Sequence, residues 1–336
     1  MNFTHRSLMS SFLALSMLAA CSAETGVPAG SEHIEIFDPA LIDLIDPQAK
    51  WEVLSEGYGW SEGPTWDKAR EQLYFTDVPG NKAYVWKDGE GTQVFLDPSG
   101  GTITEGFREP GANGLLYLDE GSMLLANHGD RSLQKLNLND NSRLTLTESF
   151  QDKKFNSPND LVMASNGDVY FSDPPYGLDG LDASPLKELD FNGVYRLSPA
   201  GDVSLVTDRL TFPNGVVLSP DNERLYIAQS DPKQAAIFSV DLNAAGPSAP
   251  KVFFDMSAYQ GDDHPGLPDG FAMTQSGTFF VTGPGGVFVI SPEGKALGRI
   301  LTGSATANCT FGEDGQTLFI TAHNRLLRIK TKAKAL

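Results

Sequence analysis

One phrase recurs six times along the chain and constrains its fold more than any other feature. Each copy has an apolar strand, a turn rich in Asp, Asn or Gly, and a second strand of aromatic or β-branched residues. The second strands read, in order, "LYFTD" from Leu73, "MLLAN" from Met123, "VYFSD" from Val169, "LYIAQ" from Leu225, "FFVTG" from Phe279 and "LFITA" from Leu318. Alternating apolar residues between turn signals predict strands, and internal repetition predicts a repeat architecture.

A second pair of short strands follows each hairpin, as in "AYVWKDGEGTQVFL" and "GVYRLSPAGDVSLVT". The unit is therefore a four-stranded meander, and six such units predict an all-β fold, a six-bladed β-propeller, over residues 34–336. The last copy, which ends in "RLLRIKTK", is one strand short. We expect the segment 33–54 to supply the missing strand and to close the propeller.

The innermost strand of each copy begins with a residue that carries a side-chain oxygen. A single Asn-Gly or Asp-Gly is ordinarily a turn, yet here the oxygen is kept in every copy. Inner strands of a propeller run parallel around its axis, so these residues are expected to form a ring at one height. The ring consists of Glu62, Asn113, Asn159, Asn214, Asp269 and Asn308.

Three long connections are expected at the same face as the ring. They read "DPSGGTITEGFREPG", "PPYGLDGLDASPLKELDFN" and "DMSAYQGDDHPGLP". Each joins the second and third strands of a copy or leads to the next copy, and both kinds of connection emerge at the edge where the inner strands begin. The connections should therefore surround the mouth of a central site, as functional loops do on a rigid scaffold.

A ring of carboxylate and amide oxygens is suited to binding a metal ion. Two carboxylates with several amides match a hard divalent cation completed by water, and we expect Ca²⁺, with Mg²⁺, Mn²⁺ and Zn²⁺ as alternatives. The ring has no histidine, which argues against a three-histidine zinc site. A cation held by three or four protein oxygens keeps open positions, so it can polarise a carbonyl group and lower the pKa of water.

The phrases "SEGPTWD", "NSPNDLVMASNGDVYFSDPPYG", "FPNGVVLSPD" and "LPDGFAM" resemble the gluconolactonase, senescence-marker-protein and luciferin-regenerating-enzyme family of six-bladed propellers. The stretches "ANHGDRSL" and "SDPPYGL" are similar to its bacterial gluconolactonase branch. The resemblance implies one divalent cation near the axis and hydrolysis of sugar lactones, or of aryl esters and organophosphates in related branches.

The resemblance also implies roles for particular residues. Glu62, Asn214 and Asp269 fall on metal-ligand positions, and Asp269 also falls on the position of the proposed general base. Asn159 falls on a position that contacts metal-bound water or substrate, so we group it with both the metal-binding and the catalytic residues. Some animal members use an arginine to grip sugar hydroxyls where this chain has Ser157, which leaves the identity of the substrate open.

Four further residues are candidates for the site. His128 follows the second strand of the second copy and is either a catalytic residue that orients substrate or carries a proton, or a histidine bonded to turn backbone. Asn113, Asp173 and Tyr176 are predicted to bind substrate. Asp173 closes "VYFSD" as Asp77 closes "LYFTD", so structural hydrogen bonds to the following turn are its alternative role.

The N-terminal stretch "MNFTHRSLMSSFLALSMLAAC" predicts a targeting segment. Its apolar run is too short to span a bilayer, and the ending before Cys21 resembles a bacterial lipobox. We expect a lipoprotein signal peptide over residues 1–20, lipidation of Cys21 and a flexible tether over 21–33; an ordinary secretory signal is the alternative. Ser22 favours, by resemblance, an anchor at the periplasmic face of the outer membrane in a Gram-negative bacterium.

The formal net charge of −18 argues against nucleic acid as a partner, because the surface repels phosphate backbones. Once Cys21 carries lipid, Cys309 is the single remaining thiol, and we expect it to be a buried apolar residue. The protein is expected to be a monomer or weak dimer.

The leading hypothesis is a metal-dependent lactonase that acts on a small-molecule lactone, with Asp269 as general base. An aryl esterase or organophosphate hydrolase would use the same ring with a more apolar mouth. A non-catalytic propeller that serves as a periplasmic binding platform would not need two carboxylates on its axis. A metal-free propeller like strictosidine synthase would not need the pair Asn214 and Asp269.

Overall fold

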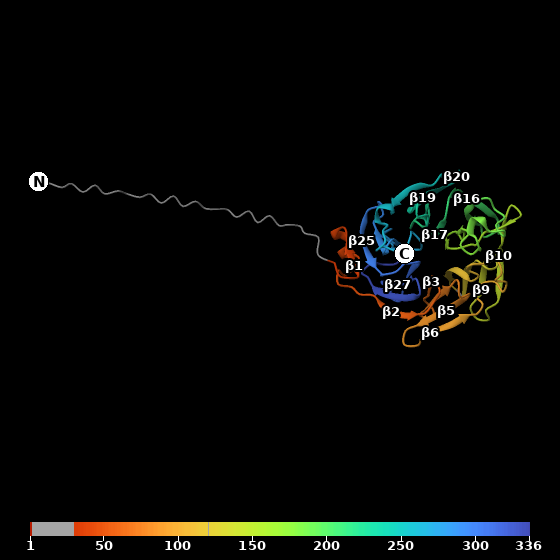
Figure 1. Ribbon diagram of the computed structural model, residues 1–336, viewed down its shortest axis with the longest axis horizontal. Coiled ribbons are helices and arrows are strands. Elements are labelled where there is room, and N and C mark those ends of the chain that lie inside the picture. The colour runs from red at the N-terminus through yellow and green to blue at the C-terminus, as the bar shows by residue number, and fades with distance from the viewer. Residues whose placement is uncertain (2–29, 120) are drawn as a thin grey trace.

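The computed structural model describes residues 1, 30–119 and 121–336. The predicted lipidation site Cys21 lies outside the described residues, as do all but Met1 of the predicted signal peptide and most of the predicted tether. Figure 1 shows six antiparallel sheets arranged as blades around one central axis. The predicted six-bladed β-propeller is therefore confirmed.

Each of the first three blades is a four-stranded meander whose strands follow one another in sequence, from the axis outward in blade one. Blade one contains β3 (Ser61–Asp67), β4 (Gln72–Asp77), β5 (Lys82–Lys87) and β6 (Gly91–Leu96). Blade two contains β7 (Ala112–Leu118), β8 (Ser122–Asn127), β9 (Ser132–Asn137) and β10 (Arg143–Thr147). A short hairpin, β11 (Ser149–Phe150) and β12 (Lys153–Lys154), precedes blade three, which contains β13 (Leu161–Met163), β14 (Val169–Asp173), β15 (Asn192–Leu197) and β16 (Val203–Leu210).

The last three blades repeat the pattern. Blade four contains β17 (Pro213–Leu218), β18 (Arg224–Gln229), β19 (Ala236–Asn243) and β21 (Lys251–Asp255), with the short β20 (Gly246–Pro247) beside β19. Blade five contains β22 (Phe271–Met273), β23 (Phe279–Gly283), β24 (Gly286–Ile290) and β25 (Ala296–Leu301), and blade six contains β26 (Asn308–Gly312), β27 (Thr317–Ala322) and β28 (Arg325–Lys330). Three short 3₁₀ helices lie in connections: η1 (Pro39–Asp43), η2 (Leu181–Ala183) and η3 (Ser257–Tyr259).

Strand β2 (Glu52–Glu56) closes the propeller. It pairs antiparallel with β28 and becomes the outermost strand of blade six, with Val53 opposite Leu327. The last blade therefore contains strands from both ends of the propeller sequence, so its hydrogen bonds join the first blade to the last. The predicted closure is confirmed.

The N-terminal segment contributes a second strand that the sequence did not predict. Strand β1 (Ile34–Ile36) pairs with β25 and adds a fifth strand to blade five. The buried guanidinium of Arg299 fastens it: Nε donates to Glu35 Oε2 at 3.0 Å, and Nη1 donates to the carbonyl of Pro284 at 2.6 Å. An ion pair that spans a blade edge thus holds the first described strand in place.

Apolar side chains fill the space between neighbouring blades. Tyr226 of blade four meets Phe279 of blade five edge-on at 4.7 Å, and Trp66 of blade one stacks on Phe319 of blade six at 5.5 Å between ring centroids. Such pairs contribute about 0.5–1.5 kcal/mol beyond their buried area. Cys309 is 2% exposed, so the prediction that it is buried is confirmed. Over residues 30–119 and 121–336, no helix is long and apolar enough to cross a membrane.

The glycine after a ring residue is required by the narrow axis, not by a turn. A Cβ atom on Gly63 would lie 2.0 Å from the carbonyl oxygen of Asn113, and one on Gly215 would lie 2.1 Å from that of Asp269. Real Cβ atoms do not approach oxygen so closely, so only glycine lets the inner strands of adjacent blades meet. This close approach explains the recurring dipeptides and brings the ring residues together.

Candidate functional site

A cavity of about 380 Å³ opens on the propeller axis at the face where the inner strands begin. Five of the six predicted ring residues line it, and each of the three long connections contributes at least one residue. The lining residues are Trp60, Glu62, Arg108, Glu109, Asn113, Asn159, Tyr176, Asn214, Ser230, Gly266, Leu267, Asp269 and Thr306. The geometry therefore brings the predicted metal-ligand candidates and the predicted substrate contacts Asn113 and Tyr176 into one place.

Asn308, the sixth predicted ring residue, begins β26 but does not line the cavity. Its Oδ1 accepts a hydrogen bond from the backbone N–H of Cys309 at 2.8 Å. Its side chain also occupies the space beside Gly270, where a Cβ atom would lie 2.0 Å from Asn308 Cγ. The side chain thus bonds to the backbone of its own strand and packs against the start of the inner strand of blade five.

Asp173, which was predicted to contact substrate, lies outside the cavity lining. Its Oδ2 accepts the N–H of Asn156 and its Oδ1 accepts the N–H of Ser157, both at 2.8 Å. Asp77 makes equivalent bonds, because its carboxylate accepts the N–H groups of Gly59 and Trp60 at 3.1 Å. The recurring aspartate holds the segment that leads into the inner strand, which is the structural role considered as the alternative.

His128 lies behind the cavity wall rather than on its surface. It is fully buried, and its Nε2 lies 3.4 Å from Asn113 Nδ2. Burial and, to a smaller extent, the charge of Arg108 lower the pKa of His128 to about 3, although the backbone of Glu109 opposes the shift. The imidazole is therefore neutral at physiological pH, and a direct catalytic role against substrate does not fit this position; it contacts the amide of Asn113 instead.

Two carboxylates face the axis: Glu62, which is buried, and Asp269, which is partly exposed. Glu62 is 2% exposed, and its oxygens accept bonds from Trp60 Nε1 at 3.4 Å and from the N–H of Gly63 at 3.0 Å. Burial raises the pKa of Glu62 to about 8, opposed by the bond from Gly63 and reinforced by the charge of Asp160. Burial and then the charge of Glu62 raise the pKa of Asp269 well above its usual range. Both carboxylates can be ionised at neutral pH only if a positive charge is placed between them.

The amide of Asn214 is held in one orientation. Its Nδ2 donates to Ser230 Oγ at 2.9 Å, and that hydroxyl donates to the carbonyl of Pro268 at 2.6 Å. Asn214 Oδ1 is buried without a hydrogen-bond partner among the described residues, and so is Asn113 Oδ1. A buried acceptor is rarely left unpaired in a folded protein, so these oxygens indicate that a ligand belongs in the cavity.

The donor set fits a hard divalent cation. In the part of the chain that the structure describes, no group of three or more His, Cys, Asp and Glu side chains could hold a metal ion. The cavity instead combines two carboxylates, Glu62 and Asp269, with the unpaired oxygen of Asn214 and the amide of Asn159. Oxygen-only sets of this kind suit Ca²⁺ or Mg²⁺ better than softer metals.

Several cavity residues were not predicted individually. Arg108 and Glu109 come from the connection between blades one and two, Ser230 follows β18, and Trp60 precedes β3. The quoted long connections were expected at the mouth, but nothing in their sequence distinguished Arg108 and Glu109 from their neighbours. Burial raises the pKa of Glu109 to about 7, and the charge of Arg108 opposes that shift.

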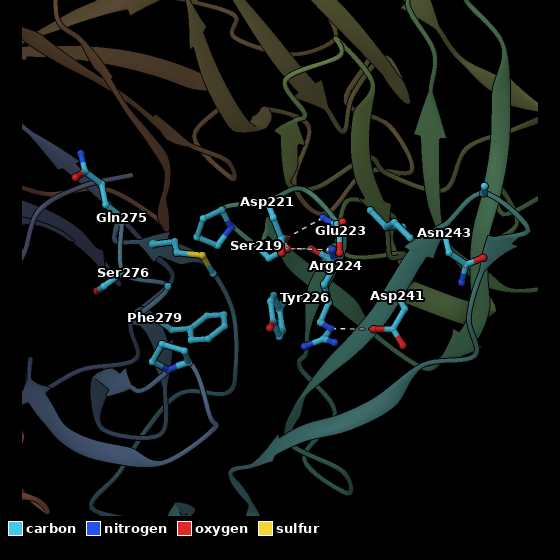
Figure 2. A pocket seen from close by; sticks show the side chains of 16 residues that line it. Ser219, Asp221, Glu223, Arg224, Tyr226, Asp241, Asn243, Gln275, Ser276 and Phe279 are labelled. Atoms are coloured by element: carbon cyan, nitrogen blue, oxygen red, sulfur yellow. Dashed lines mark hydrogen bonds and ion pairs between the residues drawn. The ribbon is translucent and has the colours of Figure 1, made fainter.

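A larger cavity of about 810 Å³ lies away from the ring, between blades four and five (Figure 2). It is lined by the β17–β18 and β22–β23 turns, which lie at the opposite end of the inner strands from the ring. The arginine in its lining is paired within the cavity, since Arg224 Nε donates to Asp241 Oδ1 at 2.9 Å. The two cavities therefore differ: among the residues described, buried amide oxygens without a partner line the axial cavity and not this one.

Fold and site together define a class: a six-bladed β-propeller with an axial cavity of carboxylates and amides. The model of the SMP-30/Gluconolactonase/LRE-like region matches residues 60–324, and the chain belongs to this family. It is 40% identical over 303 residues to a gluconolactonase of Zymomonas mobilis, covering 88% of this chain and 85% of that protein.

Solved structures agree with this assignment. A gluconolactonase from Xanthomonas campestris superimposes with a TM-score of 0.77 at 29% identity, covering 91% of this chain and 97% of that chain. A calcium-binding protein, regucalcin, from Agrobacterium tumefaciens has the same fold, with a TM-score of 0.67 at 19% identity and coverage of 85% and 96%.

Proposed function

We propose that the protein is a lactonase, a gluconolactonase-like hydrolase that opens a small-molecule lactone in the axial cavity. The observation that carries the proposal is the convergence of Glu62, Asp269 and the unpaired Oδ1 of Asn214 in one axial cavity. The gluconolactonase of Zymomonas mobilis supports the substrate class, because it is similar over most of both chains.

Glu62, Asn214 and Asp269 would hold one divalent cation, with Asn159 beside them, and Ca²⁺ suits this donor set best. When bound, the cation would supply a Lewis acid for the lactone carbonyl and stabilise the negative charge that develops on its oxygen. Glu62 is fixed by bonds from Trp60 and Gly63, which suits a ligand that does not move during the reaction.

Asp269 would act as general base. Its carboxylate would take one proton from the attacking water while the water oxygen bonds to the carbonyl carbon. The ring C–O bond then breaks, and the same proton passes to the leaving ring oxygen, which gives the open hydroxy acid. The amides of Asn159 and Asn113 line the cavity and would orient water and substrate.

The wall of the cavity favours a polar lactone over an aryl ester or a phosphotriester. Arg108 and Glu109 place two charged groups among the lining residues, beside the apolar side chains of Trp60 and Leu267. An apolar ester would have to cover these charges without replacing their hydrogen bonds, which is unfavourable. A non-catalytic binding platform would leave the two axial carboxylates without a purpose.

The substitution Asp269→Asn tests this function. Asparagine keeps an oxygen for the cation but cannot accept a proton, so we expect turnover of glucono-1,5-lactone to fall by roughly 10²–10⁴-fold at saturating Ca²⁺. Stabilisation of the variant by Ca²⁺, measured by thermal unfolding, should persist at higher concentration. Asp262→Asn, an exposed aspartate in the preceding connection, is the matched control. Full turnover by Asp269→Asn would exclude Asp269 as the base.

We also propose, from the sequence pattern, that Cys21 carries lipid and holds the protein at the periplasmic face of the outer membrane. Two or more acyl chains are needed for stable anchoring, as in a mature bacterial lipoprotein. The wild-type protein should then partition with membranes, and Cys21→Ser should abolish this partitioning. Recovery of the wild-type protein entirely in the soluble periplasmic fraction would contradict the proposal.

A further inference from the structure

The wall that carries Arg108 and Glu109 is fixed to a neighbouring loop. The carbonyl of Gly177 accepts the N–H of Arg108 at 2.9 Å and that of Glu109 at 3.3 Å. Two residues along, the N–H of Asp179 donates to the carbonyl of Gly106 at 3.0 Å, and Phe107 forms a β-bridge with Leu178. The backbone of the connection is therefore positioned by a short two-stranded contact.

The loop beneath is equally constrained. The N–H of Gly177 donates to Ser157 Oγ at 2.9 Å, and that hydroxyl donates to the carbonyl of Pro174 at 2.5 Å. A Cβ atom on Gly177 would lie 2.7 Å from Ser157 Cβ and 2.8 Å from His128 Cβ, so the loop rests directly on buried side chains. Ser157, Gly177 and Glu109 thus form three successive layers of a rigid wall, which is what precise recognition requires.

The carboxylate of Glu109 is mostly enclosed but only partly bonded. Its side chain is 12% exposed, and Oε1 lies 3.2 Å from Arg108 Nη2. Oε2 lies 4.0 Å from His128 Nδ1, which is too long for a hydrogen bond. No other described side chain donates to Oε2, so this oxygen is a free acceptor in the lining of the cavity.

Glu109 also differs in place from the axial carboxylates. Glu62 and Asp269 begin inner strands at the axis, whereas Glu109 lies in the connection that precedes β7. The hydroxyl of Tyr176, another polar group in the lining, is already engaged, since it donates to the carbonyl of Ser230 at 3.4 Å. Glu109 is thus the off-axis anionic acceptor of the described cavity, positioned to contact parts of a substrate that do not react.

We infer that Glu109 is a specificity-determining residue that accepts hydrogen bonds from the hydroxyl groups of a polyhydroxylated lactone, with Arg108 holding its carboxylate in place. This inference rests on the proposed lactonase function. A site built to bond a substrate hydroxyl discriminates strongly against an analogue that lacks it, because the buried acceptor is then left unpaired. The substrate class is accordingly a sugar lactone with free ring hydroxyls.

The test compares two six-membered lactones, glucono-1,5-lactone and δ-valerolactone, which has no hydroxyl groups. Glu109→Leu removes both acceptor oxygens at similar volume, and Glu109→Gln keeps one. We expect the ratio of kcat/KM for the hydroxylated lactone to that for δ-valerolactone to fall by roughly 10–100-fold in Glu109→Leu, with an intermediate fall in Glu109→Gln. The rate on δ-valerolactone, measured with the same preparation, shows whether each variant is folded and whether its axial residues still open a lactone.

Glu105→Gln is the matched control, because Glu105 is an exposed carboxylate in the same connection and should leave both rates unchanged. An equal loss on both lactones would assign Glu109 a structural role and overturn the inference, as would an unchanged ratio in Glu109→Leu. Failure of the wild-type protein to open either lactone would instead refute the proposed function.

Discussion

Removal of the Ser230 hydroxyl should uncouple one proposed cation ligand from its support. Ser230 is 9% exposed, and Oγ stands between two parts of the site: it accepts from Asn214 Nδ2 at 2.9 Å and donates to the carbonyl of Pro268 at 2.6 Å. Pro268 immediately precedes Asp269. The substitution Ser230→Ala deletes both hydrogen bonds while it leaves every proposed ligand in place.

The structure sets the size of the effect. Each buried hydrogen bond contributes about 1 kcal/mol net, and a buried amide left without a partner costs about 1–3 kcal/mol. We expect Ser230→Ala to lower the free energy of unfolding by about 2–4 kcal/mol. A chain of this size loses about 2 °C in Tm per kcal/mol, so Tm should fall by about 4–8 °C.

Cation affinity should fall as well, because the amide of Asn214 is then free to rotate its oxygen away from the axis. A cost of about 1 kcal/mol raises the Kd for Ca²⁺ about fivefold. Calorimetric titration of the chelator-treated protein measures that Kd. Thr331→Val is the control: it removes a buried hydroxyl that donates to the carbonyl of Gln316 at 2.7 Å, outside the cavity lining.

Two results would refute this reasoning in different ways. An unchanged Kd in Ser230→Ala, with a loss of Tm like that of Thr331→Val, would show that Ser230 stabilises the fold without orienting Asn214. An unchanged Tm would show that the chain from Asn214 through Ser230 to Pro268 contributes nothing to stability, which its burial argues against.

Three further outcomes are expected. His128 has a pKa of about 3 when buried and about 6.5 when unfolded, so the unfolded chain binds more protons between these values. The neutral buried imidazole therefore contributes fully to the free energy of unfolding above pH 6.5, and this contribution is lost towards pH 3 by up to about 1.4 kcal/mol per pH unit. In urea unfolding, the difference in free energy of unfolding between pH 7 and pH 5 should be smaller for His128→Gln than for wild type. Gly215→Ala should lower the free energy of unfolding by about 3 kcal/mol or more, because the added Cβ atom would clash with the carbonyl oxygen of Asp269. Gly261→Ala, with open space around it, should change the free energy of unfolding little, and equal melting temperatures of the two variants would contradict the close approach at Gly215. Chelator should lower the Tm of the Ca²⁺-loaded protein, since a ligand at a hundredfold excess over Kd adds about 2.7 kcal/mol, and Glu62→Gln should reduce that change; no response of wild type to chelator would contradict a bound cation.

Repetition explains why so much of this protein is predictable from its sequence. The side-chain oxygen that recurs at one position in every copy led to five cavity residues, including Glu62, Asn214 and Asp269. Because the last copy is one strand short, the sequence predicted that an N-terminal strand completes it, and β2 does pair with β28. A single Asn-Gly or Asp-Gly dipeptide is typical of a turn. Because the side-chain oxygen recurs at the same position in every copy, these dipeptides could be assigned to the propeller axis instead.

The sequence did not indicate which polar side chains stay outside the cavity because each has a partner that only the fold provides. Asn308 shares the recurring position, yet the N–H of Cys309 binds its oxygen. Asp173 precedes two prolines at the mouth, yet backbone N–H groups from the start of its blade take both carboxylate oxygens. In both residues a nearby backbone donor competes with the cavity for the same oxygen, and the sequence alone does not give the distance to that donor.

Position 157 shows how one buried residue determines which segment forms the wall of the cavity. Ser157 is fully buried, and its hydroxyl is used by Pro174 and Gly177, so the wall at this point has no room for a longer side chain directed at the cavity. The next layer out is the carbonyl of Gly177, which binds the backbone of Arg108 and Glu109. A small residue at 157 therefore admits the Gly177 turn, and that turn in turn fixes the connection whose charged side chains reach the cavity. If Glu109 contacts substrate as inferred above, recognition on this wall depends on a segment about fifty residues away in sequence, because the two loops are in contact in the fold.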